Sequence, residues 1–421
     1  MGRQLRAVLR DREAALYLGG VVVSGFGDTA MALAAGVWVK TLTGSDALAA
    51  FVGFGLWLPT LFGPLIGPLA DRVRRRPLLV AVHLALAVVM TAPLAVRTAD
   101  DVWLLFAVLV AVGGGVVLAD AAESALVATV VPEELRGDFN GLLYTSMEGM
   151  KLIAPPVGAA LFTAFGGPAV AALDACTFLL AAAAYRLLRV SEARPAARER
   201  RDWRAETAEG ARFLWRHPVL RPLVLTGGAA MLLAGLSSSA TFALIDSGLG
   251  RGPAFSGVLM PVQGAGSVVA GLAAGALMRR LPERAFAAAG LALFALGVLA
   301  RATPWLPVVL GGSLAIGLGL PCALVVAMTA VQRETPGELL GRVAATANTL
   351  LFAPTGLALL VGGAMVAGLD YRVQTVLAGT AGLVVAGALA FTGRRARRAG
   401  AGADAGDSRH EEQDRAASGA F

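Results

Sequence analysis

Five ionisable residues lie inside long apolar runs of this 421-residue chain: Asp28, Asp120, Glu123, Glu148 and Lys151. Asp120 and Glu123 are three residues apart, as are Glu148 and Lys151, so each pair shares one face of a helix. An ionised group in hydrocarbon costs several kcal/mol, so such residues usually face a cavity or a partner. The chemistry that this pattern indicates is the binding and release of protons.

The depths of these residues predict one cluster. Glu123 and Glu148 lie about eight and nine residues from the same ends of two consecutive runs, and Asp120 and Lys151 lie about eleven and twelve residues in. Three acids near one base are not all ionised cheaply in a low dielectric, so at least one should bind a proton near neutral pH. We expect Glu123 and Glu148 to carry the proton, with Lys151 tuning them and Asp28 contributing to proton or cation binding.

Simpler roles for these residues stay open. Glu148 and Lys151, with Asp120 or Glu123, could form a static buried ion pair that joins two helices. Asp28 could make a structural hydrogen bond. Trp57, in the middle of the second run, could line a cavity or pack against lipid. Two further acids, Asp174 and Asp246, lie near the outer ends of their runs, where we expect a helix cap outside the cavity and an interfacial residue, respectively.

The residues needed for other chemistry are missing from the sequence. It contains no Walker-type loop, and neither H-E-x-x-H nor G-x-S-x-G occurs. The histidines at 83, 217 and 410 are far apart, and both cysteines, Cys176 and Cys322, lie in apolar runs. We therefore expect no enzymatic activity, no metal site, no disulfide and no cofactor.

The composition is that of a membrane protein. Hydrophobic residues make up 57% of the chain and charged residues 15%, and the mean hydropathy is +0.69. A helix needs about 20 apolar residues to cross a bilayer. Twelve segments meet this requirement: 15–40, 46–69, 77–97, 102–130, 139–164, 167–188, 220–246, 254–278, 285–302, 304–330, 343–368 and 371–393. The sequence therefore predicts an all-α integral membrane protein with twelve transmembrane helices.

Basic residues predict how the chain is oriented. Of the thirty-six Lys and Arg residues, about thirty fall on the side of the termini. The positive-inside rule then places both termini in the cytoplasm of a multi-pass cell-membrane protein, in a bacterium the inner membrane. The arginines form short clusters between apolar runs, which indicates a membrane surface and not nucleic acid as the partner. Trp103 and Trp305 each begin a span at its outer end, as interfacial aromatic residues do.

One long polar interruption divides the spans into two sets of six. It contains Trp203, Phe213, Leu214 and Trp215, spaced as in an amphipathic helix on the cytoplasmic face. The predicted organisation is an N-terminal segment (1–14), a six-helix bundle (15–188), a cytoplasmic linker (189–219), a second six-helix bundle (220–393) and a disordered cytoplasmic tail (394–421).

The two halves repeat each other. Segments 132–138 and 336–342 both read P-x-E-L-x-G followed by a charged residue, at an offset of 204. Segments 67–72 and 275–280 align at an offset of 208, and the Ala-Pro pairs at 154 and 353 align at 199. Three matches in order indicate two parallel six-helix repeats. That architecture is typical of alternating-access transporters, whose substrate site lies between the halves near the midplane.

The segment 67–76 resembles the loop signature G-x-L-A-D-R-x-G-R-R of the major facilitator superfamily, with Arg74 in place of the usual glycine. The resemblance implies that this loop locks the outward-facing state. Its matching residues are Gly67, Asp71, Arg72, Arg75 and Arg76. In the second copy Arg279 stands at the position of Asp71, so that copy is expected to keep the packing and lose the acidic lock.

More narrowly, the chain is similar to the drug and siderophore exporter branch that includes enterobactin exporters. The matching pieces are 26–28, 42–45, 173–178 and 209–218. The fifth span also resembles a degraded antiporter signature, with matching positions at Gly141, Ala154, Pro155 and Gly158. This second resemblance implies export.

The function expected from these observations is proton-coupled efflux by alternating access. The cargo would be a small hydrophobic or amphipathic compound such as a drug, an antibiotic or a siderophore, as in antiporters that confer multidrug resistance. The partners would be this substrate, protons and the lipid bilayer, and the protein would act as a monomer driven by the proton gradient. A nutrient importer, a lipid flippase and a non-transporting membrane sensor are the alternatives.

Overall fold

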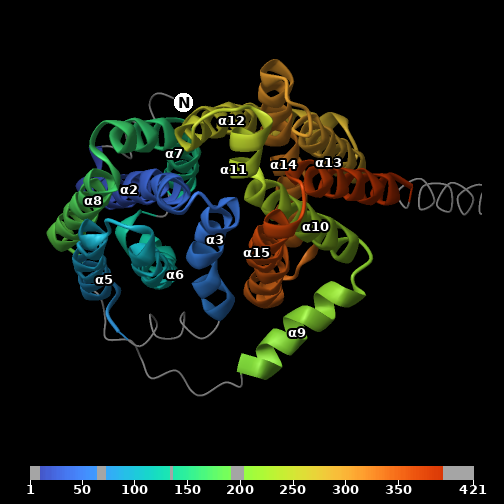
Figure 1. The fold of residues 1–421 in the computed structure, drawn as a ribbon. Helices are drawn as coiled ribbons and strands as arrows, with labels where there is room; N and C mark the ends of the chain where they lie inside the picture. The colour runs from blue at the N-terminus through green and yellow to red at the C-terminus, as the bar shows by residue number, and fades with distance from the viewer. Residues whose placement is uncertain (1–9, 64–72, 133–135, 191–202, 392–421) are drawn as a thin grey trace, which may run out of the picture.

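A computed structural model describes residues 10–63, 73–132, 136–190 and 203–391, and this part of the chain is helical without strands. The helices of the first half are α2 (Arg12–Thr43), α3 (Asp46–Trp57), α5 (Arg75–Val89), α6 (Val102–Val130), α7 (Arg136–Phe165) and α8 (Gly167–Leu187) (Figure 1). After α9 (Trp203–Arg216), the second half contains α10 (Leu220–Ser239), α11 (Thr241–Ala243), α12 (Ser256–Arg280), α13 (Glu283–Ala300), α14 (Leu306–Glu334), α15 (Gly337–Gly368) and the helix Tyr371–Phe391.

Ten of the described helices are long and apolar enough to cross a membrane. They coincide with ten of the twelve predicted spans. The predicted span 46–69 is described only to residue 63, as α3 followed by the short helix η1 (Leu58–Phe62). The predicted span 139–164 lies within α7, which has 30 residues but carries polar and charged side chains along its first half. The prediction of an all-α membrane protein is confirmed, and the helices fit a twelve-span fold.

Local signals set the tight turn between α2 and α3. Gly44 ends α2 in the left-handed region, with φ at 67°, and its N–H bonds to the Lys40 carbonyl. A residue with a side chain would be strained in that conformation. Ser45 then caps α3 by accepting a hydrogen bond from the Leu48 N–H. The two helices therefore form a hairpin, which holds Lys40 close to the start of α3.

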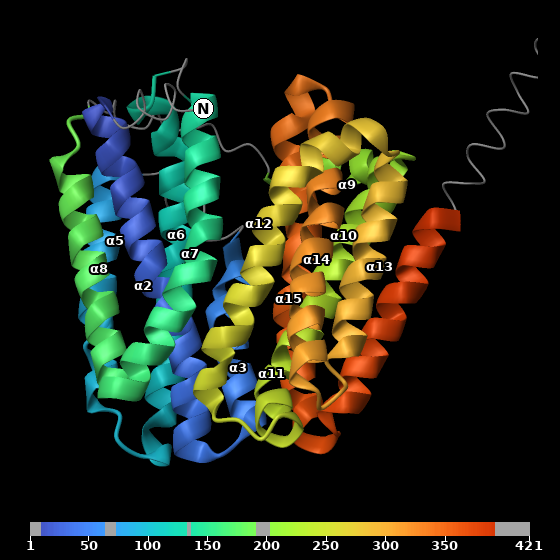
Figure 2. The same cartoon turned by 90° about the horizontal axis from the view of Figure 1, so that it is seen from above.

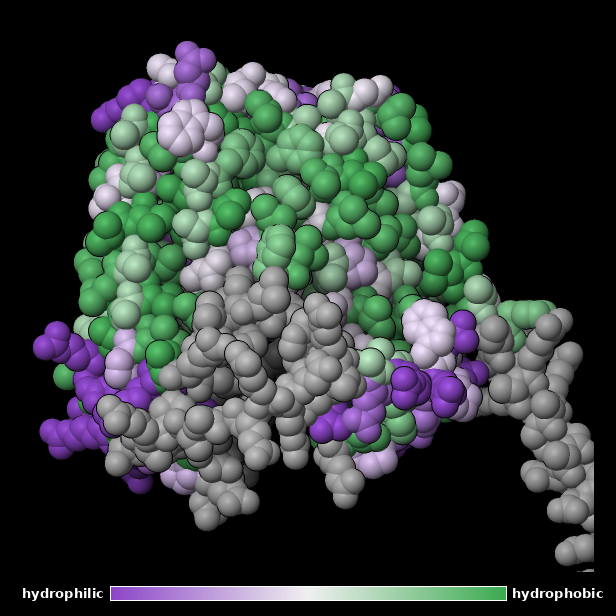
Figure 3. Space-filling view, turned by 90° about the horizontal axis from the view of Figure 1, so that it is seen from below, coloured by the Kyte–Doolittle hydropathy of each residue, from purple (hydrophilic) through white to green (hydrophobic). Residues whose placement is uncertain are grey.

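Each half of the molecule packs around its own apolar core. In the first half the core includes Tyr17, Leu105 and Phe178, and in the second half fully buried residues such as Phe294 and Val326 play that part. Figure 2 shows the two groups of helices side by side, with the start of α2, near the N-terminus of the chain, and the end of the last helix at the same end of the molecule. Figure 3 shows a broad hydrophobic band with hydrophilic residues at its two ends, as a membrane-spanning protein requires.

Small residues let α7 contact both α2 and α12. A Cβ on Gly158 would lie 2.6 Å from the Ala30 carbonyl oxygen of α2. A Cβ on Gly257 of α12 would lie 2.6 Å from the Ala159 Cβ. Ala154 is fully buried beside this crossing. Much of the antiporter-like motif therefore lies where α7 meets helices of both halves.

The helix α9 packs against the second half. Leu214 is fully buried in that core. A Cβ on Gly210 would lie 2.7 Å from the Arg342 carbonyl oxygen, so glycine permits a close approach to α15. Glu209 forms an ion pair with Arg342 at the same contact. Figure 1 shows α9 lying beyond α15 at the edge of the bundle.

Candidate functional site

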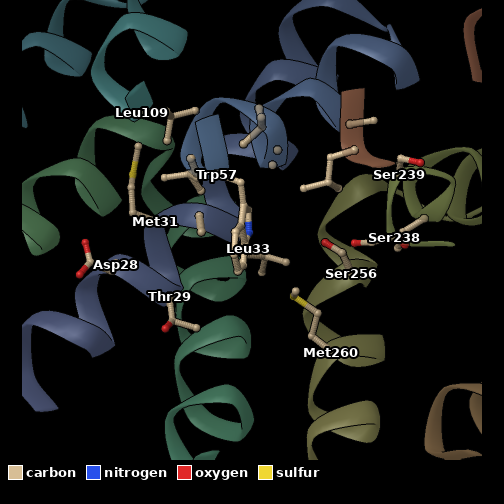
Figure 4. Close-up of a pocket in the computed structure, with 18 of the residues that line it drawn as sticks. Asp28, Thr29, Met31, Leu33, Trp57, Leu109, Ser238, Ser239, Ser256 and Met260 are labelled. Atoms are coloured by element: carbon tan, nitrogen blue, oxygen red, sulfur yellow. The ribbon is translucent and has the colours of Figure 1, made fainter. Parts of the chain in front are cut away.

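A cavity of about 810 Å³ lies between the two halves. Its walls come from α2, α3 and α6 on one side and from α10 and α12 on the other, and most of the lining side chains are apolar. Figure 4 shows Asp28 and Trp57 on the side of the first half, with Ser238, Ser256 and Met260 facing them from the second half. Trp57 thus lines the cavity, which was one of its two predicted positions.

Three carboxylates stand on the first-half wall of this cavity: Asp28, Asp120 and Asp174. The Oδ1 atom of Asp28 is buried without a hydrogen-bond partner. Asp174 reaches the backbone of Gly27, directly before Asp28, and Asp120 lines the same cavity. Among the described residues, no ion pair reaches the three wall carboxylates. This wall therefore holds concentrated negative charge or protons.

Asp174 does not lie outside the cavity as a helix cap, which corrects the prediction. It is 1% exposed, lines the cavity from α8, and accepts a hydrogen bond from Thr177 at 3.2 Å. A Cβ on Gly27 would lie 2.3 Å from Asp174 Oδ1, so the absence of a side chain at Gly27 lets this carboxylate reach α2 beside Asp28. The sequence signal was the glycine directly before Asp28.

The predicted cluster of three acids and one lysine is divided in the structure. Lys151 is bonded to Glu148 on its own helix, and its side chain is 55% exposed. Glu123 instead accepts a hydrogen bond from Tyr185 at 2.6 Å. No ion pair between Lys151 and Asp120 or Glu123 is present in the described part of the chain. The predicted depths do not bring the groups together, because α7 packs along α2 and α12 and not along α6.

Three of the predicted gating-loop residues lie outside the described part of the chain, namely Gly67, Asp71 and Arg72. The other two, Arg75 and Arg76, begin α5. Arg76 donates hydrogen bonds to the Tyr185 carbonyl at 3.2 Å and to the Arg186 carbonyl at 2.5 Å. It therefore ties the start of α5 to the end of α8, within the first half.

An ion-pair network joins the halves at the end opposite the N-terminus. Lys40 is 7% exposed and bonds to Asp46 at 2.9 Å and to Asp246 at 2.6 Å. Asp46 belongs to the first half and Asp246 to the second. A Cβ on Gly36, one turn earlier in α2, would lie 2.7 Å from the Phe242 ring, so the halves also pack tightly there. The side chain of Asp246 is 55% exposed, and the sequence did not predict its pairing across the halves.

The second-half wall contains a buried arginine that follows an apolar run of the sequence. Arg301 follows α13, lines the cavity and is 5% exposed. It donates to Ser313 Oγ and to Gln263 Oε1. Its position at the end of an apolar run resembles that of a loop residue, and only the packing of α12 and α14 against α13 shows that it points inward.

Comparisons with known proteins place this geometry in a known family. A search of the curated proteins finds no match. Among solved structures, a point mutant of the nucleoside transporter NupG is similar with a TM-score of 0.73 and 11% identity, covering 90% of this chain and 98% of that one. A point mutant of the peptide transporter POT, in complex with alafosfalin, gives 0.67 and 17%, over 90% and 94% of the chains. A bacterial homologue of the iron transporter ferroportin, in its inward-facing state, gives 0.65 and 16%, over 91% and 99%.

At these identities the solved structures show the fold alone. The family model described as Major Facilitator Superfamily matches residues 17–349, which is well over half of the chain. The match covers the helices that build most of the cavity and both partners of the Lys40–Asp246 contact. With its helical fold and its cavity between two halves, this chain is a multi-pass membrane transporter that belongs to the major facilitator superfamily.

Proposed function

We propose that this transporter exports a small hydrophobic or amphipathic compound, such as a drug, an antibiotic or a siderophore, in exchange for protons. The observation that carries the proposal is the cavity wall formed by Asp28, Asp120 and Asp174, which has no basic partner among the described residues. Like charges that lie close together in a low dielectric disfavour simultaneous ionisation, so such a wall takes up protons readily. The remainder of the lining is mostly apolar, which suits a cargo with an apolar body.

Coupling in this proposal follows from competition within one cavity. When the cavity opens outward, protons bind the carboxylates and cargo leaves. When it opens to the cytoplasm, the protons are released and cargo enters. Two further acids are candidates for the path by which protons leave. Glu123 lies one turn from Asp120 and accepts a hydrogen bond from Tyr185, and Glu148 is paired with Lys151. The Glu148–Lys151 pair lies within one helix, so it does not act as a static bridge between two helices.

The proposed resting state is inward-facing, with both termini in the cytoplasm. Support comes from the Lys40–Asp246 bond, which joins the halves at the end opposite the N-terminus. Arg186, Arg216 and Arg280 lie in the last turns of α8, α9 and α12, and α8 and α12 end on the side where α2 begins (Figure 2). That distribution agrees with a cytoplasmic face under the positive-inside rule.

The test is transport in inverted membrane vesicles, whose lumen corresponds to the outside of the cell. A proton gradient that is acidic inside should drive uptake of compounds from a panel of amphipathic drugs and siderophores, and a protonophore should abolish it. Uptake that ignores the gradient, or that appears only in right-side-out vesicles, would refute coupled export. Movement of labelled phospholipid in the same vesicles would identify a flippase instead.

A further inference from the structure

Arg301 is a buried cation on the cavity wall for which no acidic partner is present in the described part of the chain. Its Nε and Nη2 atoms donate to Ser313 Oγ at 3.2 and 2.9 Å, and Nη2 also donates to Gln263 Oε1 at 3.2 Å. Both acceptors are neutral. The Nη1 atom makes no hydrogen bond to a described residue.

The positive charge of the Arg301 guanidinium is therefore not neutralised by a described acidic side chain. A guanidinium stays protonated at physiological pH, and burying it without a counter-ion is costly. Ser313 and Gln263 compensate part of the lost hydration and fix the plane of the guanidinium, which leaves the two N–H groups of Nη1 to donate to an anionic group. If Arg301 only linked α12, α13 and α14, a neutral side chain would make similar hydrogen bonds without the charge.

The position of Arg301 opposite the acidic wall gives the cavity two charged sides. Asp28, Asp120 and Asp174 come from the first half, and Arg301 comes from the second half. Arg301 is the only basic residue among those that line the described cavity. A cavity that took only apolar or cationic cargo would have no use for it.

We propose that Arg301, oriented by Ser313 and Gln263, binds a carboxylate group of the transported compound. The inference rests on the proposed function only in taking this cavity as the transport site. It narrows the cargo to amphipathic compounds with an anionic end, whose apolar body contacts the aliphatic lining around Leu259 and Met260. An amine on the same cargo would meet the acidic wall.

The test measures binding of two fluorescent probes, Nε-dansyl-lysine and its methyl ester, to the purified full-length transporter in detergent. The two differ only in the free carboxylate. The wild type should bind the acid about 10- to 100-fold more tightly than the ester, which is the effect expected of a hydrogen bond between charged groups. In Arg301→Gln the preference should vanish, with affinity for the ester unchanged, and Arg301→Lys should restore part of it.

The control Arg251→Gln removes an exposed cation from the loop before α12 and should leave the preference intact. Thermal unfolding without probe separates binding from structure: Arg301→Gln should be as stable as the wild type or more stable, because a buried unpaired charge is lost. The inference is overturned if the acid binds no more tightly than the ester, or if Arg301→Gln weakens both equally. The binding assay uses no proton gradient, so its outcome is independent of the transport test. Carboxylate binding can be confirmed when coupled export is refuted, and coupled export can be confirmed when carboxylate binding is refuted.

Discussion

Asp28 is the residue whose surroundings give the most direct test of proton coupling. One of its carboxylate oxygens is buried without a partner, and two further carboxylates, Asp120 and Asp174, line the same cavity. An amide at this position could still hydrogen-bond but could not carry a proton. The residue therefore separates a role in coupling from a role in packing.

We expect Asp28→Asn to fold normally and to lose gradient-driven uptake by about tenfold or more, as when a positioned proton carrier is removed. Stability should be unchanged or raised, because no ion pair is broken. Uptake in inverted vesicles and thermal unfolding of the purified protein would check both effects. Asp100→Asn, an exposed carboxylate at the opposite end from the N-terminus, is the matched control and should transport normally. Wild-type coupling in Asp28→Asn would remove Asp28 from the mechanism.

The Glu148–Lys151 pair gives a second prediction at the same scale. Lys151 is 55% exposed, and a pair of this spacing on one helix contributes only about 0.3–0.5 kcal/mol, so Lys151→Gln should lower stability by no more than that. If Glu148 carries protons, the double variant Glu148→Gln/Lys151→Gln should stay as inactive in gradient-driven transport as Glu148→Gln alone. Recovery of transport in the double variant would show that the pair serves only to balance charge.

At the scale of helices, the crossing of α7 with α2 depends on Gly158. A Cβ there would lie 2.6 Å from a backbone oxygen, which a side-chain rotation cannot relieve. We expect Gly158→Ala to destabilise the protein by about 1–3 kcal/mol, the usual cost of overpacking. Gly149→Ala is the control on the same helix, since a Cβ at Gly149 would have no atom within 4 Å. Its stability should be unchanged or higher, because alanine favours helix. Equal unfolding temperatures for the two variants would contradict the packing argument.

The sequence predicts where the helices lie along the chain better than it predicts which helices pack together. Apolar length and capping predict where each span lies, because both are local properties. Helix packing depends on residues far apart in the sequence, and for this reason the predicted acid cluster does not form. The depths of Glu123 and Lys151 are well matched, but α6 and α7 do not lie along each other. The same limit applies to Asp174 and Arg301, because the sequence alone does not show which helices pack against them.

For the whole molecule, the main question is how the two halves exchange access to the cavity. At the end opposite the N-terminus, the described contacts between the halves include the Lys40–Asp246 bond and the packing of Phe242 on Gly36. The transition must break these contacts together. Lys40 is also bonded to Asp46 within its own half, so this lysine keeps a partner when the halves separate.

Removing the cross-half bond should therefore shift the population toward the state that is open at this end. Because the Asp246 side chain is 55% exposed, its contribution is about 1 kcal/mol at most, which corresponds to about a fivefold change in the ratio of the two states. Spin labels on Thr41→Cys and Arg251→Cys, with Cys176 and Cys322 replaced by serine, report the distance between the halves by electron paramagnetic resonance. Asp246→Asn should increase the population at longer distance. Asp46→Asn, which leaves the bond between the halves in place, should not. If both variants shift the distances equally, Lys40 stabilises the first half alone, and the closed end depends on packing around Phe242.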